Sequence, residues 1–243
     1  MLISITTATA WICYFFALTN IEPAVANTLF SGSGPFIVIL VSFFANNETR
    51  NYRRKRLEQL CYGGLFATLI AIVIVAITGR SGLDSTTPRD AILGSLSAIT
   101  SGTLIAISLI ISRSMNEAGL TANAVMAVRF SLGVLVAAIV IGVQDQPSDI
   151  ASDWATLGVS GAALCLIVLP SYALQIGVSL TAPLTVQVIV SLSPLIVFTA
   201  QFLDGRTHYA PATLTCIVFH GIFILSANVL RGWKNDPARR EEI

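Results

Sequence analysis

An all-α polytopic membrane protein with eight transmembrane helices is the fold class that the sequence predicts. Of its 243 residues 54% are hydrophobic and only 11% are charged, and the mean hydropathy is +0.78. Soluble domains carry about 25% charged residues, so this chain lacks the ionic surface of a water-soluble domain. Two further observations support the prediction: the apolar residues form eight stretches of helical length, and arginine and lysine are distributed unevenly between them.

Each of the eight stretches is long enough to cross a bilayer, because a span needs about 20 mostly apolar residues. Lipid cannot satisfy open backbone groups and no alternating barrel pattern is present, so these spans are predicted to be helices. They cover residues 2–20, 23–45, 60–79, 90–112, 122–143, 154–178, 181–203 and 209–230. Met1 leads directly into the first stretch without a charged leader, so we expect the chain to begin at its first span.

The cationic residues predict that both termini lie in the cytoplasm. The connection between the second and third stretches contains five of them, Arg50, Arg53, Arg54, Lys55 and Arg56. If this connection is cytoplasmic, Arg113 and the tail residues Arg231, Lys234, Arg239 and Arg240 are also inside, against Arg80, Arg89 and Arg206 outside. We therefore expect a multi-pass protein of the cell (inner or plasma) membrane.

The second and seventh stretches resemble each other at an offset of 159 residues. Residues 32–44 and 191–203 share four identities at this offset: Pro35/Pro194, Ile37/Ile196, Val38/Val197 and Phe43/Phe202. Each copy has a mid-span proline and follows a turn with another proline. The two stretches are five spans apart, so they run in opposite directions. Inverted repeats of this kind are typical of secondary transporters.

The mid-span prolines are predicted to form kinks with polar faces beside them. A proline inside a helix frees the carbonyl four residues earlier, here those of Ser31 and Val190. Polar and small residues precede each proline at matching offsets, namely Thr28 and Gly32 in one copy and Gln187 and Ser191 in the other. We favour a polar, slightly unwound cavity wall with a contribution from each repeat. The alternative is a packed kink whose hydroxyls bond their own helix.

Further candidates for the substrate path are Tyr14 in the first span, Tyr172 and Gln175 in the sixth, Arg129 in the fifth and His220 in the last. Ionisable groups inside spans are functional hypotheses by default. Arg129 lies about 10 Å from the predicted cytoplasmic end of its span, and either reaches that interface or holds an anionic group in an inner vestibule. His220 is either a neutral, hydrogen-bonded core histidine or a group coupled to protons or substrate. Tyr14 either lines a cavity or packs in the core.

The fourth stretch has a small residue at every fourth position: Gly94, Ala98, Gly102 and Ala106. This pattern indicates close approach of another helix. The neighbouring serines Ser97, Ser101 and Ser108 are expected to bond between helices, with a cavity-lining role as the alternative.

Other chemistries find little support. Cys13, Cys61, Cys165 and Cys216 are irregularly spaced within apolar runs, which indicates neither a metal site nor a redox pair. Gly158–Gly161 spells GxSG, the serine motif of rhomboid intramembrane proteases, with His220 as the possible partner of Ser160. The two residues differ in predicted depth by about 7 Å, and a nucleophile must lie within hydrogen-bond reach of its base. A protease is therefore the less favoured interpretation, and we do not expect the protein to be an enzyme.

The segment Ala17–Ala26 followed by Pro35 resembles the third and fourth helices of an EamA domain, which defines the drug/metabolite transporter superfamily. Leu180–Leu195 resembles the same element of a second EamA domain, whose opening helices are similar to Gly94–Arg113 and the Arg129–Phe130 pair. The resemblance implies two inverted repeats of five helices around a central cavity. Residues 90–231 would form a complete second repeat, and residues 1–79 a first repeat of only three helices. Residues 80–89 would form an external loop and 232–243 a cytoplasmic tail.

The expected function is transport, in the export direction, of a small organic metabolite or drug by alternating access, without a cofactor, a metal or a nucleic-acid partner. The polar wall would comprise Thr28, Ser31, Gln187 and Ser191. The incomplete 3+5 arrangement would leave the cavity open on one side unless lipid or a homodimer partner fills it. The main alternative is a degenerate or truncated carrier with a binding or scaffold role.

Overall fold

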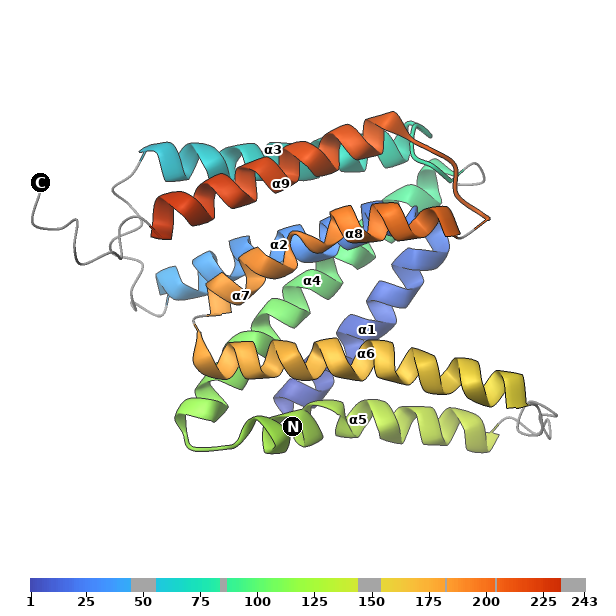
Figure 1. The fold of residues 1–243 in the computed structure, drawn as a ribbon, viewed down its shortest axis with the longest axis vertical. Helices are drawn as coiled ribbons and strands as arrows, with labels where there is room; N and C mark the ends of the chain where they lie inside the picture. Colours follow the sequence, from blue (N-terminus) through green and yellow to red (C-terminus); the bar gives the residue numbers. More distant parts are fainter. Residues whose placement is uncertain (45–55, 84–86, 144–153, 182, 204, 233–243) are drawn as a thin grey trace, which may run out of the picture.

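The computed structural model describes residues 1–44, 56–83, 87–143, 154–181, 183–203 and 205–232, and every regular element in this part is a helix (Figure 1). The helices are α1 (Leu2–Asn20), α2 (Pro23–Phe44), α3 (Arg56–Ile77), α4 (Pro88–Glu117), α5 (Ala122–Val143), α6 (Trp154–Leu180), α7 (Pro183–Val190), α8 (Ser193–Ala200) and α9 (Pro211–Gly232), with a short 3-10 helix, η3 (Gln201–Leu203), after α8. All eight predicted stretches are helical, which confirms the all-α class.

Five helical segments are long and apolar enough to cross a membrane: Leu2–Asn20, Gln59–Ile77, Pro88–Glu117, Thr185–Leu203 and Pro211–Leu230. Ala122–Val136 and Val168–Leu180 are shorter apolar segments among the described residues. Large apolar side chains such as Ile12, Ile74 and Phe219 are exposed on the outside of the bundle. A lipid-facing surface needs such side chains, so the fold is that of a multi-pass membrane protein.

The seventh predicted span is not one continuous helix, and its interruption lies beside Pro194, where the sequence predicts slight unwinding. It breaks at Ser191 and Leu192 into α7 and α8. Pro194 consequently lies in the first turn of α8, where its missing N–H leaves no helical hydrogen bond unmade. Pro35, by contrast, stays inside the continuous helix α2. The two prolines of the repeat therefore have different local structures.

Helix α4 begins two residues before its predicted start because it carries a cap that hydropathy does not register. The Thr87 hydroxyl accepts a hydrogen bond from the Asp90 backbone N–H (3.2 Å) and donates one to the Asp90 carboxylate (2.6 Å). Pro88 occupies the first turn of the helix. Threonine at the N-cap and proline in the first turn are typical helix-start residues.

Helix α4 packs between α1 and α2, whereas α3 lies along α9, and α5 lies along α6 on the other side of the bundle (Figure 1). A Cβ atom built on Gly102 would lie 2.0 Å from the Phe30 carbonyl oxygen, so α2 and α4 are in close contact. The Ser101 hydroxyl donates to the Ala10 carbonyl (2.6 Å), and the Ser108 and Thr7 hydroxyls share a hydrogen bond (2.9 Å). Gly102 therefore serves the expected close packing, and Ser101 and Ser108 the expected interhelical bonding, whereas no bond of Ser97 to another helix is seen among the described residues.

One end of the bundle is tied together by Glu22, which lies in the α1–α2 turn and is completely buried. Its carboxylate accepts hydrogen bonds from the Gly82 backbone N–H (2.7 Å), the Gln201 side-chain amide (2.6 Å) and the Thr213 hydroxyl (2.8 Å). These donors come from the α3–α4 connection, η3 and α9. We call this end the Glu22 end.

At the opposite end, Arg113 near the end of α4 donates hydrogen bonds to the Val178 and Ser179 carbonyls (3.3 and 3.0 Å) in the last turn of α6. A cation here complements the partial negative charge of the helix C-terminus. Arg113 also pairs with Glu117 at 2.7 Å. We call this the Arg113 end. The arginines and lysine of residues 50–55 and the tail beyond 232 lie outside the described residues, so the predicted orientation stays a prediction.

Candidate functional site

Polar residues of α2 lie against the break between α7 and α8, in the interior of the bundle. The Ser191 hydroxyl is 2.8 Å from the Ser31 carbonyl oxygen and equally 2.8 Å from the Gln187 carbonyl oxygen. Nearer the Glu22 end, the Asn27 amide donates to the Ser193 hydroxyl (2.8 Å). Asn27 thus contacts Ser193, whereas Ser31, four residues later in α2, contacts the earlier residue Ser191. The two segments therefore run antiparallel here. We call this contact the polar junction.

The hydroxyl groups predicted for the cavity wall bond mainly to their own helices. Thr28 donates to the Ala24 carbonyl (2.6 Å), and Ser31 donates to the Asn27 carbonyl (2.7 Å). Thr28, Ser31, Gln187 and Ser191 are all 2% exposed or less. In this conformation the four side chains therefore lie in direct contact between helices, and their role in a substrate path stays a prediction.

Two glycines of α2 allow larger side chains to lie directly on its backbone. A Cβ atom on Gly34 would be 1.6 Å from Nε2 of Gln187, and one on Gly32 would be 2.5 Å from Cε1 of His220. Any side chain at these positions would have to displace the glutamine or the histidine. The glycines thus bring Gln187 from α7 and His220 from α9 onto the same part of α2, close to Pro35.

Each of these side chains has one buried polar atom without a hydrogen-bond partner among the described residues: Oε1 of Gln187 and Nε2 of His220. The other ring nitrogen of His220 lies 3.4 Å from the Thr68 hydroxyl of α3. Buried polar atoms are usually paired, and an unpaired one costs free energy. The polar junction therefore has an unused acceptor on Gln187 and an unpaired ring nitrogen on His220, which can accept or donate depending on its tautomer.

Tyr14 joins the polar junction through Asn27, which the sequence analysis did not single out. Its hydroxyl donates to the Asn27 side-chain oxygen (3.3 Å), and its ring packs on Phe30 with 4.9 Å between the centroids. Asn27 is 6% exposed. A polar asparagine within an apolar stretch could have identified this position from sequence. Its counterpart at the 159-residue offset is the apolar Val186, so the comparison of the two repeats did not identify it.

Arg129 lies apart from the polar junction, between α5 and α1. It is 3% exposed, and its Nε donates to the Thr7 hydroxyl (3.2 Å), which in turn contacts Ser108 of α4. Its guanidinium is 5.9 Å from the centre of the neighbouring Phe130 ring. The side chain therefore points into the bundle, where it bonds α1 directly and is linked to α4 through the Thr7 hydroxyl.

The two α6 candidates are placed differently from each other. Tyr172 is 40% exposed and belongs to the outer surface, whereas Gln175 is fully buried with both amide atoms unpaired. Ser112 and Asn116 of α4 likewise have buried polar atoms without partners. The side chain of Ser160 lies outside the described residues. The structure therefore gathers Tyr14, Thr28, Ser31, Gln187, Ser191 and His220, and leaves Arg129, Tyr172 and Gln175 elsewhere.

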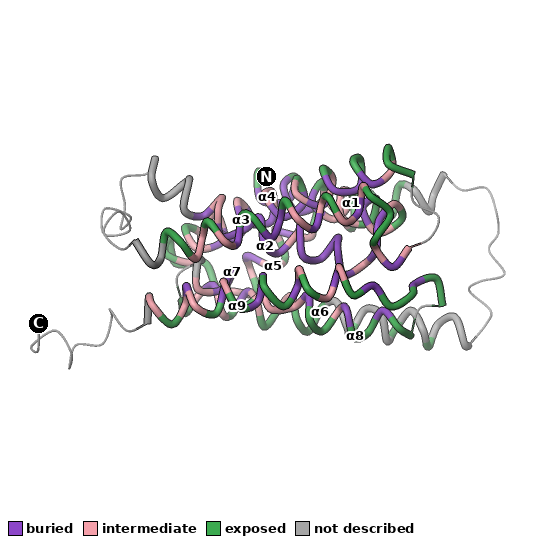
Figure 2. Tube along the Cα trace, turned by 90° about the horizontal axis from the view of Figure 1, so that it is seen from above, coloured by how far each residue is buried: buried purple, intermediate pink, exposed green. Residues whose placement is uncertain are grey.

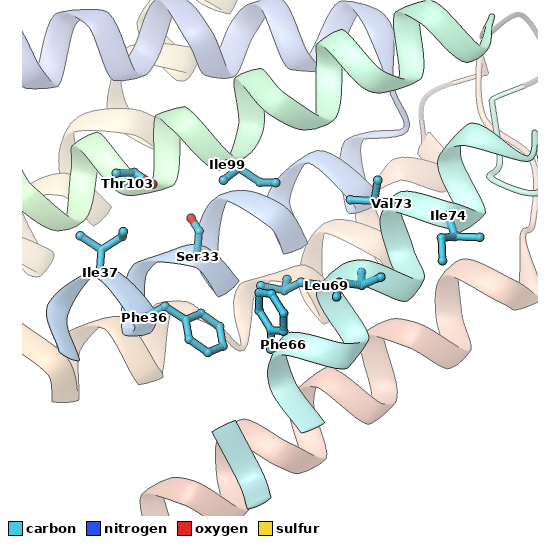
Figure 3. A pocket seen from close by; sticks show the side chains of 10 residues that line it. Ser33, Phe36, Ile37, Phe66, Leu69, Val73, Ile74, Ile99 and Thr103 are labelled. Atoms are coloured by element: carbon cyan, nitrogen blue, oxygen red, sulfur yellow. The ribbon is translucent and has the colours of Figure 1, made fainter. Parts of the chain in front are cut away.

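A cavity of about 400 Å³ lies between α2, α3 and α4 (Figure 3). Its lining is apolar apart from two hydroxyl side chains, and it comprises Ser33, Phe36, Ile37, Phe66, Leu69, Ile70, Val73, Ile74, Ile99 and Thr103. Phe66 and Ile74 are more than half exposed, so the cavity reaches the surface that would face lipid. It is a separate feature from the polar junction, whose side chains are buried. Buried residues are concentrated in the interior of the helix bundle and exposed residues on its outer sides (Figure 2).

No family model matches the chain, and no curated protein matches it. Solved structures do match. One chain, described only as "Crystal structure of protein", aligns with 97% of this chain and 77% of its own length, with a TM-score of 0.63 and 17% sequence identity. At that identity the likeness concerns the fold alone.

Proposed function

We propose that the chain is a secondary-type transporter that moves a small organic solute across the membrane by alternating access, as in the EamA-type drug/metabolite transporters that the sequence resembles. Export is the proposed direction. The relevant halves are α1–α3 and α4–α9, which correspond to the partial and complete repeats. The polar junction is the proposed centre of the solute path.

The observation that carries the proposal is the reciprocal contact between the two repeats. At the 159-residue offset, Gly34 corresponds to Ser193, and Thr28 corresponds to Gln187. The contact between Asn27 and Ser193 therefore has a counterpart, within one residue, in the contact between Gln187 and Gly34. Two copies related by a two-fold axis make contacts in such pairs, and inverted repeats that meet in this way support a transporter architecture.

The chemistry of the polar junction also suits a solute path. Broken helices and unpaired backbone at membrane depth are tolerated where they line a cavity or are buried in protein. The break at Ser191 and the unpaired atoms of Gln187 and His220 offer groups that a polar solute would pair. At the Glu22 end the hydrogen bonds around Glu22 tie four segments together, which supports a conformation that is closed at that end.

We further propose that the Arg113 end faces the cytoplasm, with both termini there. This orientation rests on the distribution of arginine and lysine in the sequence. Opening of the bundle at the Arg113 end would then give a solute access to the buried polar junction from the cytoplasm.

Purified full-length protein in liposomes tests the proposal directly. The liposomes are loaded with a defined mixture of amino acids, nucleosides and small organic acids, and release is followed by mass spectrometry. We expect release of at least one component, and less release by the Gln187→Ala and Arg129→Ala variants. Unchanged release by both variants would contradict the assignment of the site. No release by the parent protein would contradict transport and favour the binding or scaffold role.

Two glycine-to-alanine variants, one at the polar junction and one away from it, provide a matched comparison for the same experiment. Gly34→Ala would place a Cβ atom 1.6 Å from the Gln187 amide nitrogen, whereas a Cβ on Gly63 of α3 has no atom within 4 Å. Release should fall in Gly34→Ala and stay at the parent level in Gly63→Ala. Equal release by the two variants would argue against movement at the polar junction.

A further inference from the structure

Arg129 is a buried cation whose counter-ion is not among the described residues. An arginine side chain stays protonated in proteins, and burying a charge without an opposite charge is strongly unfavourable. The described contacts of its side chain are the Thr7 hydroxyl and the Phe130 ring. Within the described part of the chain, no carboxylate lies within 4.0 Å of it.

The three carboxylates whose side chains the structure describes are engaged elsewhere. Glu22 accepts three hydrogen bonds at the Glu22 end. Asp90 is bonded to Thr87 at the start of α4, and Glu117 pairs with Arg113. The negative charge that Arg129 requires is thus not supplied by any of them.

A series of hydroxyl groups leads from Arg129 through Thr7 to α4 and offers further donors. The Thr7 oxygen accepts from the Arg129 Nε and shares a hydrogen bond with Ser108. That shared bond uses only one of the two hydroxyl hydrogens, so the other is left for a further acceptor. One helical turn from Ser108 on the same face of α4, the Ser112 hydroxyl is completely buried and has no partner.

We propose that Arg129, together with Thr7, Ser108 and Ser112, binds a carboxylate or phosphate group. A guanidinium presents paired N–H donors that match both anions, and among the described residues its hydrogen bond is made by Nε, which leaves the two Nη atoms for a ligand. The anionic group belongs either to the transported solute or to the headgroup of an anionic lipid. The solute case rests on the proposed transport function and would make the substrate an organic acid or a phosphate ester.

Binding is measured without flux, on purified protein in nanodiscs of neutral phosphatidylcholine. Thermal unfolding is followed in the presence of inorganic phosphate, acetate and, as the uncharged counterpart, acetamide. The lipid source is tested separately by native mass spectrometry of detergent-extracted protein, through retention of phosphatidylglycerol. We expect the parent to be stabilised by an anion and not by acetamide, or to retain the anionic lipid. The first result identifies a solute site and the second a lipid site.

The variants decide whether Arg129 is responsible. Arg129→Gln should weaken the response to the anion by about tenfold or more, and Arg129→Lys should weaken it less. Arg89→Gln removes an exposed cation at the start of α4 and should behave as the parent does. If Arg129→Gln does not fold, Ser108→Ala and Ser112→Ala keep the charge and should still lower the affinity.

The proposal would be overturned if the parent responded to no anion and retained no anionic lipid, or if all Arg129, Ser108 and Ser112 variants bound as the parent does. Solute release in liposomes without any anion binding would remove this site and leave the transport function standing. Anion binding without release would support the site and contradict the carrier.

Discussion

The Ser191 hydroxyl lies 2.8 Å from the carbonyl oxygen of Ser31. Pro35 has no N–H to offer that carbonyl, so a residue from the other repeat takes the place of the missing helical donor. Pro35 of one repeat and Ser191 of the other therefore act together. The carbonyl that the proline leaves without a helical donor accepts a hydrogen bond from the serine at the break between α7 and α8.

Replacing Ser191 with alanine should lower the stability of the protein by about 1 kcal/mol, because the Ser31 carbonyl would lose its side-chain donor. Thermal unfolding in detergent measures the change. Ser179→Ala is the matched control, since the Ser179 hydroxyl bonds only to the Ile176 carbonyl of its own helix. Equal unfolding temperatures for the two variants would show that the hydrogen bond to Ser31 contributes little.

Replacing Gly102 with alanine should destabilise the protein by about 2 kcal/mol, because the new methyl group would press on the Phe30 backbone. The same change at Gly63, where a Cβ meets no atom within 4 Å, should be neutral or stabilising by up to about 1 kcal/mol, since alanine is the better helix former. Opposite shifts of the unfolding temperature are therefore expected. A loss of similar size at both positions would contradict the close α2–α4 contact.

Replacing Glu22 with glutamine should lower the free energy of unfolding by about 2 kcal/mol. The carboxylate accepts hydrogen bonds from Gly82, Gln201 and Thr213, whereas a glutamine has a single acceptor oxygen and leaves buried donors unpaired. Glu117→Gln makes the same chemical change in an exposed ion pair and should cost less than about 1 kcal/mol. Thermal unfolding compares the two variants, and an equal effect would show that the buried hydrogen bonds around Glu22 contribute little to stability.

Gln175→Met should make the protein more stable, by about 1 kcal/mol, because it removes two buried amide atoms that have no partners. The two side chains have similar length and volume, so packing should change little. Thermal unfolding of the variant, beside a liposome release measurement, tests this. Lower stability would mean that water or a solute pairs the amide, and higher stability with lost release would place the amide in the solute path.

Much of the fold could be predicted from sequence, because hydropathy and helix length are properties of each segment alone. The eight helical stretches were predicted for this reason, within a few residues at most ends. The sequence predicted slight unwinding beside both mid-span prolines, but the structure has a break before Pro194 and a continuous helix around Pro35. The same proline spacing thus gives two outcomes, and the difference depends on contacts elsewhere in the fold. The start of α4 was also missed, because the Thr87 cap is polar and lies outside the apolar stretch from which the helix was predicted.

Part of the candidate site was predictable from the two mid-span prolines of the repeat. Ser31, Gln187 and Ser191 were found because the prolines marked their positions, and the structure brings them together. Asn27 was missed because its counterpart is apolar. The partners of Glu22 come from three distant segments, so no spacing rule could join them. The contact between Arg129 and Thr7 could not be predicted for the same reason, because Thr7 lies 122 residues earlier in the chain.

The deep burial of α2 has a consequence for how the protein is made. Asn27, Ser31 and Pro35 disfavour the entry of this helix into lipid on its own. Ser191, which bonds the Ser31 carbonyl, is 160 residues further along the chain and is synthesised much later. The hydrogen bond between the Ser191 hydroxyl and the Ser31 carbonyl can therefore form only after α7 and α8 have been synthesised. Until then the carbonyl that Pro35 frees lacks its serine donor.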